Sequence, residues 1–507
     1  MSTQINSFKE KLFSFHQNLK NGLFEFLFRP PSETSVSKIG NLLFLAIAYL
    51  GGMFHWAWLI NYGKVQHRYM DWQMFYDFYQ VTQGALIEKT IPYFMSYFYK
   101  GTNQFLAVPA TDLFPTIYLL KFLSVEDFFL TQLILVYSLG FWGCLWLKKK
   151  YQWSLVAFLV LFLLFNFNGH ITSHLAVGHW SWIAYFLFPF FVGWVLSLVE
   201  GDDVGSRPAR LAFILFGILL LGGLHPFVWC LLFLLLLAPF QRRYWKPILT
   251  GVALALVFST YRILPAAITF WGYKNPFMYG FPTVSVFWNS LTSIYQSPEV
   301  ILDMKYSDTS SMPWWEVDHY ISILGVGFLL YFGLWRRWRE TEALTDYRVL
   351  NIPMLLITIF SFGAIFGYIS HLPLPLISVE RTPSRFLILP LLILFALSCI
   401  WMQKTFDRLR PGWGVQFLAV AGIIFEGIFL MEHSAAWYAH ASKFNLDPGL
   451  LQNLESNSDW AKSVEGYYIP VVQISYLISL IALLAFAGFI YFNKKTGRKQ
   501  REQGENL

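Results

Sequence analysis

The chain has 507 residues, of which 56% are hydrophobic and only 13% are charged, and its mean hydropathy is +0.47. A sequence of this composition cannot cover a water-soluble surface, so the soluble globular classes are excluded and a polytopic membrane protein is expected. The formal net charge is +7, but the basic residues lie in short loops beside apolar segments, where membrane topology requires them, so nucleic acid is not needed as a partner.

Apolar runs of about 17 to 25 residues, the length of a membrane-spanning helix, recur along the chain. They do not alternate as barrel strands do, and backbone polar groups in lipid must be satisfied internally, so the predicted fold is all-α with about twelve transmembrane helices. The three cysteines all fall in apolar segments and indicate neither a disulfide framework nor a thiolate metal site. The N-terminus lacks a cleavable signal pattern, so we expect the first span to be retained.

The N-terminal third sets the predicted topology. Residues 1–38 form an amphipathic segment on the cytoplasmic side, and residues 39–61 form the first span. An aromatic-rich loop, 62–124, follows and carries an amphipathic helix on the membrane surface. The second span, 125–147, ends in three consecutive lysines, which mark the cytoplasmic side and place loop 62–124 outside.

The middle of the chain continues this alternation. The third span ends near Asn166, and we expect a short external turn to carry His170, His174 and His179. Residues 211–240 contain two short apolar halves around Gly-Gly-Leu-His-Pro and predict a hairpin of short helices. A seventh span then rises to Arg262 and Pro265.

The C-terminal half has the same pattern of acidic residues outside and basic residues inside. A long external loop, about 270–312, leads into span eight, and Arg381 begins span ten on the external side. The transmembrane domain occupies 39–493, and a basic cytoplasmic tail occupies 494–507. Both termini are therefore predicted to be cytoplasmic. No internal repeat is visible, which weakens a transporter interpretation built on duplicated halves.

With this topology, uncommon polar residues gather on the external face, and ionisable groups at membrane depth are expensive enough to indicate a site. Asp71 is the candidate general base, because flanking Met70 and Trp72 would desolvate it and raise its basicity. An ion pair with Arg68 is the structural alternative. The further candidates for substrate binding are Asp77, His174, His179, Glu316 and His319.

Several of these candidates have simpler explanations. Asp77 lies on the predicted amphipathic helix and could be solvated or cap a neighbour. His170 and His174 have the i, i+4 spacing of a metal site. No HExxH pattern accompanies them, however, and interfacial histidines are commonly hydrogen-bonded, so the metal interpretation is the weaker one.

Two arginines four residues apart, Arg381 and Arg385, can point the same way if a helix begins near Pro383. Their guanidiniums suit the oxygens of a donor phosphate. Snorkelling toward lipid headgroups is the alternative. Arg262 could be a third phosphate contact or a partner of Glu316.

An external carboxylate base facing arginines at a lipid boundary suits sugar transfer from a polyprenyl phosphate. The carboxylate would deprotonate an acceptor hydroxyl, and arginine would hold the departing lipid phosphate, with inversion at the anomeric carbon. The donor arrives within the bilayer, so no nucleotide-binding fold is required. No cofactor is indicated, and a divalent metal is compatible with the site but not indicated.

The chain also resembles a known family. Asp71 followed by GALIEKTIPYF is similar to the first external loop of the GT-C superfamily of membrane glycosyltransferases. The segments NGHITSHLAVGHWSW, STYRILPAA, WWEVDHYISILGVG and RTPSRFLILP resemble, in the same order, its large bacterial YfhO-like branch. The resemblance covers about 40–400 and implies that Asp71 occupies the family's catalytic acidic position. The adjacent pair of acids common in that superfamily is absent, because Trp72 follows Asp71.

The sequence therefore predicts a hexosyl or pentosyl transferase in the bacterial inner (plasma) membrane. Its partners would be membrane lipids, a polyprenyl-phosphate sugar and a glycan or lipid acceptor of the cell envelope. A lipid-linked glycan transporter or flippase, or a non-catalytic membrane subunit of a larger complex, are the alternatives. An O-antigen polymerase or ligase would more naturally place its arginines in one large periplasmic loop.

Overall fold

The structure is a computed structural model that describes residues 22–30, 35–64, 71–94, 104–202, 206–240, 242–269, 280–294, 301–303, 311–339, 347–370, 380–409, 411–441 and 466–504. The chain divides into two compact units. Unit 1 comprises 1–73, 126–200 and 275–445, and unit 2 comprises 74–125, 201–274 and 446–507. Each unit therefore assembles segments that lie far apart in the sequence.

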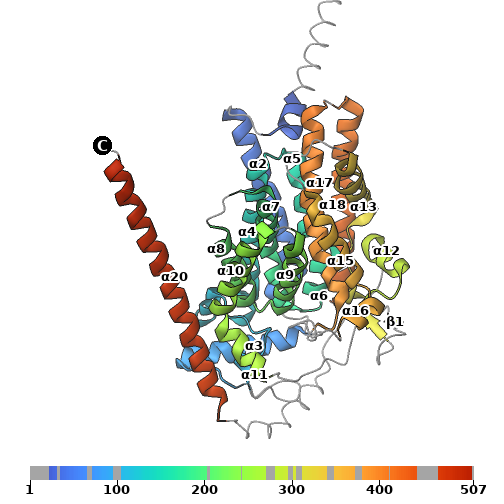
Figure 1. The fold of residues 1–507 in the computed structure, drawn as a ribbon. Coiled ribbons are helices and arrows are strands. Elements are labelled where there is room, and N and C mark those ends of the chain that lie inside the picture. Colours follow the sequence, from blue (N-terminus) through green and yellow to red (C-terminus); the bar gives the residue numbers. More distant parts are fainter. Residues whose placement is uncertain are drawn as a thin grey trace, which may run out of the picture. The chain divides into compact units, whose positions relative to one another are not determined.

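The described residues are almost entirely helical, as the apolar runs predict (Figure 1). One two-stranded antiparallel sheet, β1 (Ile301–Asp303) with β2 (Ser311–Pro313), is the exception within this part of the chain. Seven described helices are long and apolar enough to cross a membrane, and the number is eight if one bent pair counts as a single span. The protein is thus a multi-pass helical membrane protein, and the figure of twelve spans stays a prediction.

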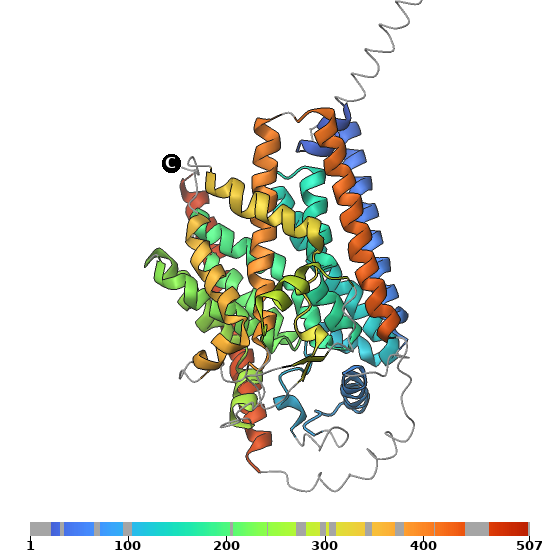
Figure 2. The same cartoon turned by 90° about the vertical axis from the view of Figure 1, so that its right-hand side faces the viewer.

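Long helices form the framework of unit 1. They are α2 (Ser35–Leu59), α4 (Val125–Lys150), α5 (Leu155–Asn166), α7 (Phe188–Glu200), α17 (Ile388–Arg408) and α18 (Trp413–Ala441). The predicted first two spans, 39–61 and 125–147, agree with α2 and α4 within a few residues. Helix α5 packs against both α17 and α18, and Figure 2 shows these last two helices standing apart.

The segment expected to be a short external turn, 167–182, is buried and largely helical, and the chain turns only at 177–179, between the candidate spans Leu155–Ala176 and Trp180–Glu200. Asn168 caps α6 (Gly169–Ala176) by accepting from the Ile171 backbone N–H, so the chain restarts as a helix directly after α5. A 3-10 segment, η4 (Trp180–Leu187), follows and leads into α7. The predicted end of the third span near Asn166 was wrong, and His170 and His174 lie in the helix and not in the turn. The polar side chains here are buried by partners from distant segments, which hydropathy cannot show.

Short elements complete unit 1 beside these spans. They are η1 (Asn61–Gly63), α12 (Val284–Thr292), η6 (Trp314–Glu316), α13 (Ser322–Phe328), the π-helix η7 (Leu329–Arg336), α14 (Arg337–Arg339), η8 (Tyr347–Leu350), α15 (Asn351–Phe360), α16 (Gly363–Ile369) and η10 (Pro383–Leu387). Residues 22–28 are also helical, and Phe28 packs edge-on against Phe406 of α17 with ring centroids 5.1 Å apart. The N-terminal segment therefore contacts the spans through its aromatic side.

Unit 2 contains most of α3 (Trp72–Glu88), with η2 (Phe105–Ala107), η3 (Pro115–Lys121), α8 (Arg207–Leu220), α9 (Leu224–Leu237), η5 (Ala238–Phe240), α10 (Arg242–Phe258), α11 (Thr260–Thr269) and α20 (Tyr468–Gly504). Helix α3 buries Phe75, Phe78 and Tyr79, as the amphipathic pattern predicts. The short helices α8 and α9 turn at Gly222, which has a φ of +78°, and this confirms the expected hairpin.

The predicted seventh span is not one straight helix. Helices α10 and α11 bend by 75° at Ser259. At this break the Thr260 hydroxyl donates to the carbonyls of Leu256 and Val257 at 3.2 and 2.9 Å, so it satisfies groups that the interrupted helix leaves open. The pair is either a broken span or a re-entrant element.

Candidate functional site

The candidate site lies in unit 1, where the chain between α2 and α3 meets the segment after α6. The Asp71 backbone N–H donates to Val177 O at 3.2 Å, and the Trp72 indole N–H donates to Ala176 O at 3.1 Å. Gly178 has a φ of +86°, and a Cβ there would overlap the backbone nitrogen and ring of Trp72. The close approach that places Asp71 thus requires glycine at position 178.

An aromatic cluster holds Trp72 in this position. Its ring contacts Phe129 and Trp180 with centroid distances of 5.4 and 5.7 Å, and these two rings are 4.7 Å apart. The Trp180 indole in turn donates to Gln132 Oε1 at 2.9 Å. The packing of Trp72 therefore fixes the backbone position of its neighbour Asp71, although the side chain of Asp71 remains 46% exposed.

A chain of imidazoles leads inward from Asp71. His179 Nε2 lies 3.4 Å from Asp71 Oδ2, and His179 Nδ1 lies 2.6 Å from His174 Nδ1. His174 Nε2 is buried and has no hydrogen-bond partner among the described residues. A proton on that atom would be a buried donor without an acceptor, so the favoured tautomer has His174 Nδ1–H donating to His179 and His179 Nε2–H donating to Asp71.

Trp182 connects the imidazoles to a buried arginine. Its indole N–H donates to His170 Nε2 at 3.2 Å, and its ring lies 4.6 Å from that of His174. The Arg385 guanidinium carbon lies 4.7 Å from the Trp182 ring centroid, a cation–π contact. The three histidines that the sequence singled out are thus brought together with the ERTPSRF segment.

Arg385 is also half of a buried ion pair. Its Nε donates to Glu316 Oε2 at 2.6 Å, and both side chains are almost completely buried. The predicted helix start at Pro383 is confirmed by η10. The two arginines do not present the same surface, however, because Arg385 is engaged with Glu316 whereas Arg381 is exposed.

Asp318 anchors the loop that carries Glu316 and His319. Asp318 Oδ2 accepts from His433 Nε2 at 2.9 Å and from the Trp437 indole at 2.8 Å, both on α18. Its Oδ1 accepts from the Tyr320 backbone N–H at 3.0 Å. These charge-assisted bonds lie in a buried environment, so they fix the loop beside α6.

His319 lies next to the imidazole chain, with its ring 5.0 Å from that of His170. Its Nδ1–H donates to Val317 O at 2.9 Å. Burial lowers the pKa of His319 to about 4, against the opposing effects of that bond and of Asp318. His319 is therefore neutral near pH 7, with an Nε2 lone pair that has no partner in the described part of the chain.

The electrostatics of Asp71 depend on the same groups. Desolvation raises the pKa of the Asp71 carboxyl to about 6; the charge of Arg381 lowers this pKa, Glu316 raises it and Arg385 lowers it. The carboxylate is surrounded by protein yet open on one side. A carboxylate of this basicity is well suited to accept a proton near neutral pH.

Two predicted site residues belong to unit 2. Arg262 is buried, and its guanidinium donates to the carbonyls of Leu106, Val108 and Thr111, the first two at 3.4 and 2.8 Å. It thereby satisfies the backbone around η2. Asp77 lies part-buried on α3. Neither is used in the site described above.

Sequence reasoning missed Trp182, Gly178 and the His433–Asp318–Trp437 cluster. The only available signal was the density of aromatic and small residues in NGHITSHLAVGHWSW.

No group of three or more His, Cys, Asp or Glu side chains among the described residues is placed to hold a metal ion. Comparison with protein-family models, with curated proteins and with solved structures gave no match.

Proposed function

We propose that the protein is a membrane glycosyltransferase that moves a sugar from a polyprenyl-phosphate donor to a glycan or lipid acceptor of the bacterial cell envelope. The observation that carries the proposal is the pairing of a partly exposed carboxylate, whose pKa is raised to about 6, with the exposed Arg381 close enough to act on its charge. Base catalysis beside an anionic leaving group needs these two elements together.

In the proposed reaction, the acceptor hydroxyl gives its proton to Asp71 as its oxygen attacks the anomeric carbon. The bond between that carbon and the phosphate oxygen breaks, and the lipid phosphate leaves with the electron pair. Arg381 stabilises the developing phosphate charge, while Arg385 remains paired with Glu316 and adds to the local positive potential. Displacement from the opposite face inverts the anomeric centre.

His179 is a positioning residue in this scheme. Its Nε2–H faces Asp71 Oδ2, so Oδ1 can face the acceptor hydroxyl. His174 fixes the tautomer of His179 through the 2.6 Å contact between the two Nδ1 atoms. The arrangement orients the base in the way that a buried partner orients a catalytic histidine in hydrolases.

Asp71→Asn tests the proposal directly. Removing a general base lowers the rate by about 100-fold to 10,000-fold, so transfer should fall by at least this much. The measurement is product formation by the purified full chain in nanodiscs, with a panel of polyprenyl-phosphate sugars and membrane-extracted acceptors, alongside donor binding. Donor binding and expression should stay near those of the unsubstituted protein.

Asp407→Asn is the matched control. Its carboxylate has a comparable exposure of 43% and pairs with Arg29, and it lies at the far end of α17 from Arg381. Turnover should be unaffected by this change. Retained turnover in Asp71→Asn would remove Asp71 from the base role. Movement of a lipid-linked glycan across the membrane without a new glycosidic bond would favour the flippase alternative.

A further inference from the structure

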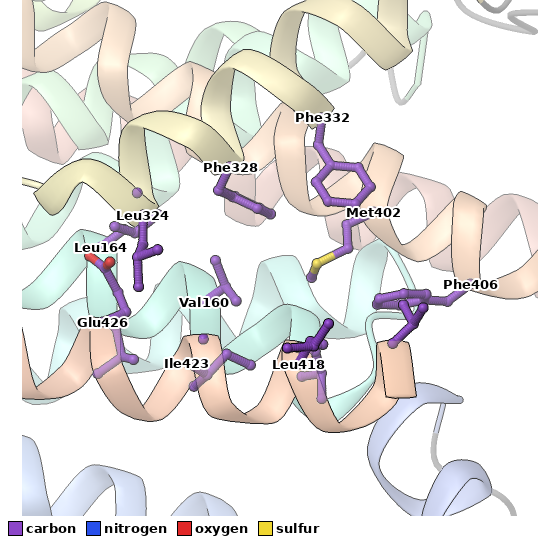
Figure 3. A pocket seen from close by; sticks show the side chains of 16 residues that line it. Val160, Leu164, Leu324, Phe328, Phe332, Met402, Phe406, Leu418, Ile423 and Glu426 are labelled. Atoms are coloured by element: carbon purple, nitrogen blue, oxygen red, sulfur yellow. The ribbon is translucent and has the colours of Figure 1, made fainter. Parts of the chain in front are cut away.

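A groove of about 360 Å³ opens between α5, α17, α18 and the α13–η7 helix of unit 1. Figure 3 shows Phe328 and Phe332 above it, Leu418 and Ile423 of α18 below it, and Phe406 at one end. Its lining is aliphatic or aromatic with a single ionisable exception, Glu426, among the described residues. Three of the four helices belong to candidate spans, so the groove is at membrane depth.

Glu426 closes the other end of the groove, beside Leu164 and Leu324 (Figure 3). Ser322, in the left-handed region at a φ of +61°, donates its hydroxyl to Glu426 Oε2 and accepts from the Gly325 backbone N–H. Glu426 is only 6% exposed, and its Oε1 has no hydrogen-bond partner among the described residues. The groove therefore ends at a buried carboxyl group that Ser322 holds in place.

The groove is open along its side. Leu324 and Leu418 line it but are 40% and 69% exposed, so its walls continue into an apolar surface. An apolar cavity does not hold ordered water, because water needs polar partners. At membrane depth, the material that can fill it is hydrocarbon.

The end at Phe406 is basic on balance, because the carboxylate of Asp407 beside it is paired with Arg29. Basic side chains follow the lining residues on both helices there: Arg336 and Arg339 follow Phe332, and Lys404 and Arg408 flank Phe406 on α17. The Arg336 Nε donates to Thr405 Oγ1 at 3.4 Å, which ties the two basic helix ends together. Basic pockets between spans on the cytoplasmic side attract anionic lipid headgroups.

The groove also points away from the candidate site along α18. Its lining on this helix runs from Val415 to Glu426, whereas the loop beside the site is bound by His433 and Trp437, further toward the C-terminus of the helix. A lipid headgroup at the Phe406 end is therefore separated from Asp71 by most of the span. The groove is not the binding site that the proposed reaction requires for its donor phosphate.

We propose that this groove binds one acyl chain of an anionic phospholipid of the bilayer, with the phosphate at the Arg336–Arg408 end and the chain running toward Glu426. The basic helix ends favour a phosphate at their own end of the groove, so they set the direction of the bound lipid. This site does not depend on the glycosyltransferase proposal.

The test uses the purified full chain in nanodiscs of phosphatidylethanolamine with phosphatidylglycerol that carries a photoreactive diazirine on its acyl chain. Cross-links should map to the groove residues of α18 and η7, and diazirine-labelled phosphatidylcholine should give several-fold fewer. Gly422→Phe should remove them, because a Cβ at Gly422 meets no atom within 4 Å and the added ring would occupy the groove.

Gly414→Phe is the matched control, since Gly414 lies on the same helix, also meets nothing within 4 Å and does not line the groove. This variant should cross-link like the unsubstituted protein. The double variant Arg336→Gln with Arg408→Gln should lose the preference for phosphatidylglycerol while still cross-linking.

Three results would overturn the proposal: unchanged cross-linking in Gly422→Phe, equal cross-linking of both phospholipids, and displacement of the phospholipid by polyprenyl phosphate. The last would assign the groove to an isoprenoid chain. Since no readout involves sugar transfer, a failed glycosyltransferase proposal leaves this test interpretable.

Discussion

Arg381 and Arg385 illustrate how two arginines four residues apart acquire different roles. Arg385 is buried against Trp182 and paired with Glu316, so removing Glu316 would leave an uncompensated buried charge, at a cost of about 3 to 5 kcal/mol. Arg381 is exposed, and its charge lowers the pKa of Asp71. Arg381 can therefore be altered without breaking a buried pair, and its effect on the base can be measured separately.

Arg381→Gln should move the pH dependence of activity to higher pH. Asp71 must be ionised to act as a base, so activity rises as the pH passes through about 6. Loss of the positive charge disfavours the carboxylate, raises the pKa of Asp71 and shifts the acidic limb of kcat/KM upward by about one pH unit or less. The measurement is a pH profile of transfer between pH 5 and pH 8.

Arg408→Gln provides the comparison for this profile. Arg408 is likewise exposed but ends α17, whereas Arg381 lies just before its beginning. Its removal should leave the acidic limb in place. An unshifted limb in Arg381→Gln would mean that this arginine does not act on the base.

The sequence could identify the residue types of the site but not their pairing. Unit 1 brings together all of the following candidates from the sequence: Asp71, His174, His179, Glu316, His319, Arg381 and Arg385. The Arg385–Glu316 pair spans 69 residues of chain, and no local pattern specifies such a partner. The role of Trp182 also depends on the tertiary arrangement, because only its contacts with the imidazoles and Arg385 distinguish it from the other tryptophans.

At the scale of elements, the position of Asp71 depends on the turn between α6 and η4. Gly178→Ala should disturb it, because the new Cβ would overlap Trp72 and because a left-handed alanine costs about 1 to 2 kcal/mol. A displacement of the base by about 1 Å can lower turnover by about 100-fold. Thermal unfolding and transfer activity should therefore both decrease in this variant.

Gly201→Ala separates the two effects. Gly201 has the same φ of +86°, but a Cβ there meets nothing within 4 Å. This variant should carry the backbone strain alone, with a lower melting temperature and unchanged turnover per folded molecule. Equal turnover losses in both variants would show that strain, and not contact with Trp72, causes the defect.

Element boundaries were predictable where hydropathy alone decides them. The spans at α2 and α4 and the α8–α9 hairpin agree with the sequence predictions. The prediction for the α6 segment failed because Asn168 starts a new helix there. In addition, Asp318 lies against Gly169, and these residues are 149 positions apart in the sequence, so no local sequence window contains both. The bend between α10 and α11 was not predicted, because hydropathy averaged over a window is insensitive to one interrupted helical turn.

At the scale of the whole molecule, the direction of the chain through the membrane remains a prediction, and unit 1 makes it testable. Gly63, at the end of η1, packs against the Glu126 backbone at the beginning of α4. Helix α4 has 26 residues and is about 39 Å long at 1.5 Å per residue, enough to cross the hydrocarbon. Lys64 and Lys149 therefore lie at opposite ends of one span.

A cysteine at Lys64 should react from outside intact cells with a membrane-impermeant maleimide, and a cysteine at Lys149 should react only after the membrane is opened, since the basic end of α4 is expected in the cytoplasm. The native Cys144, Cys230 and Cys399 are buried, so their background should be low. The unsubstituted protein measures that background. The reverse labelling pattern would place Asp71 on the cytoplasmic side and would exclude an external acceptor for the proposed transfer.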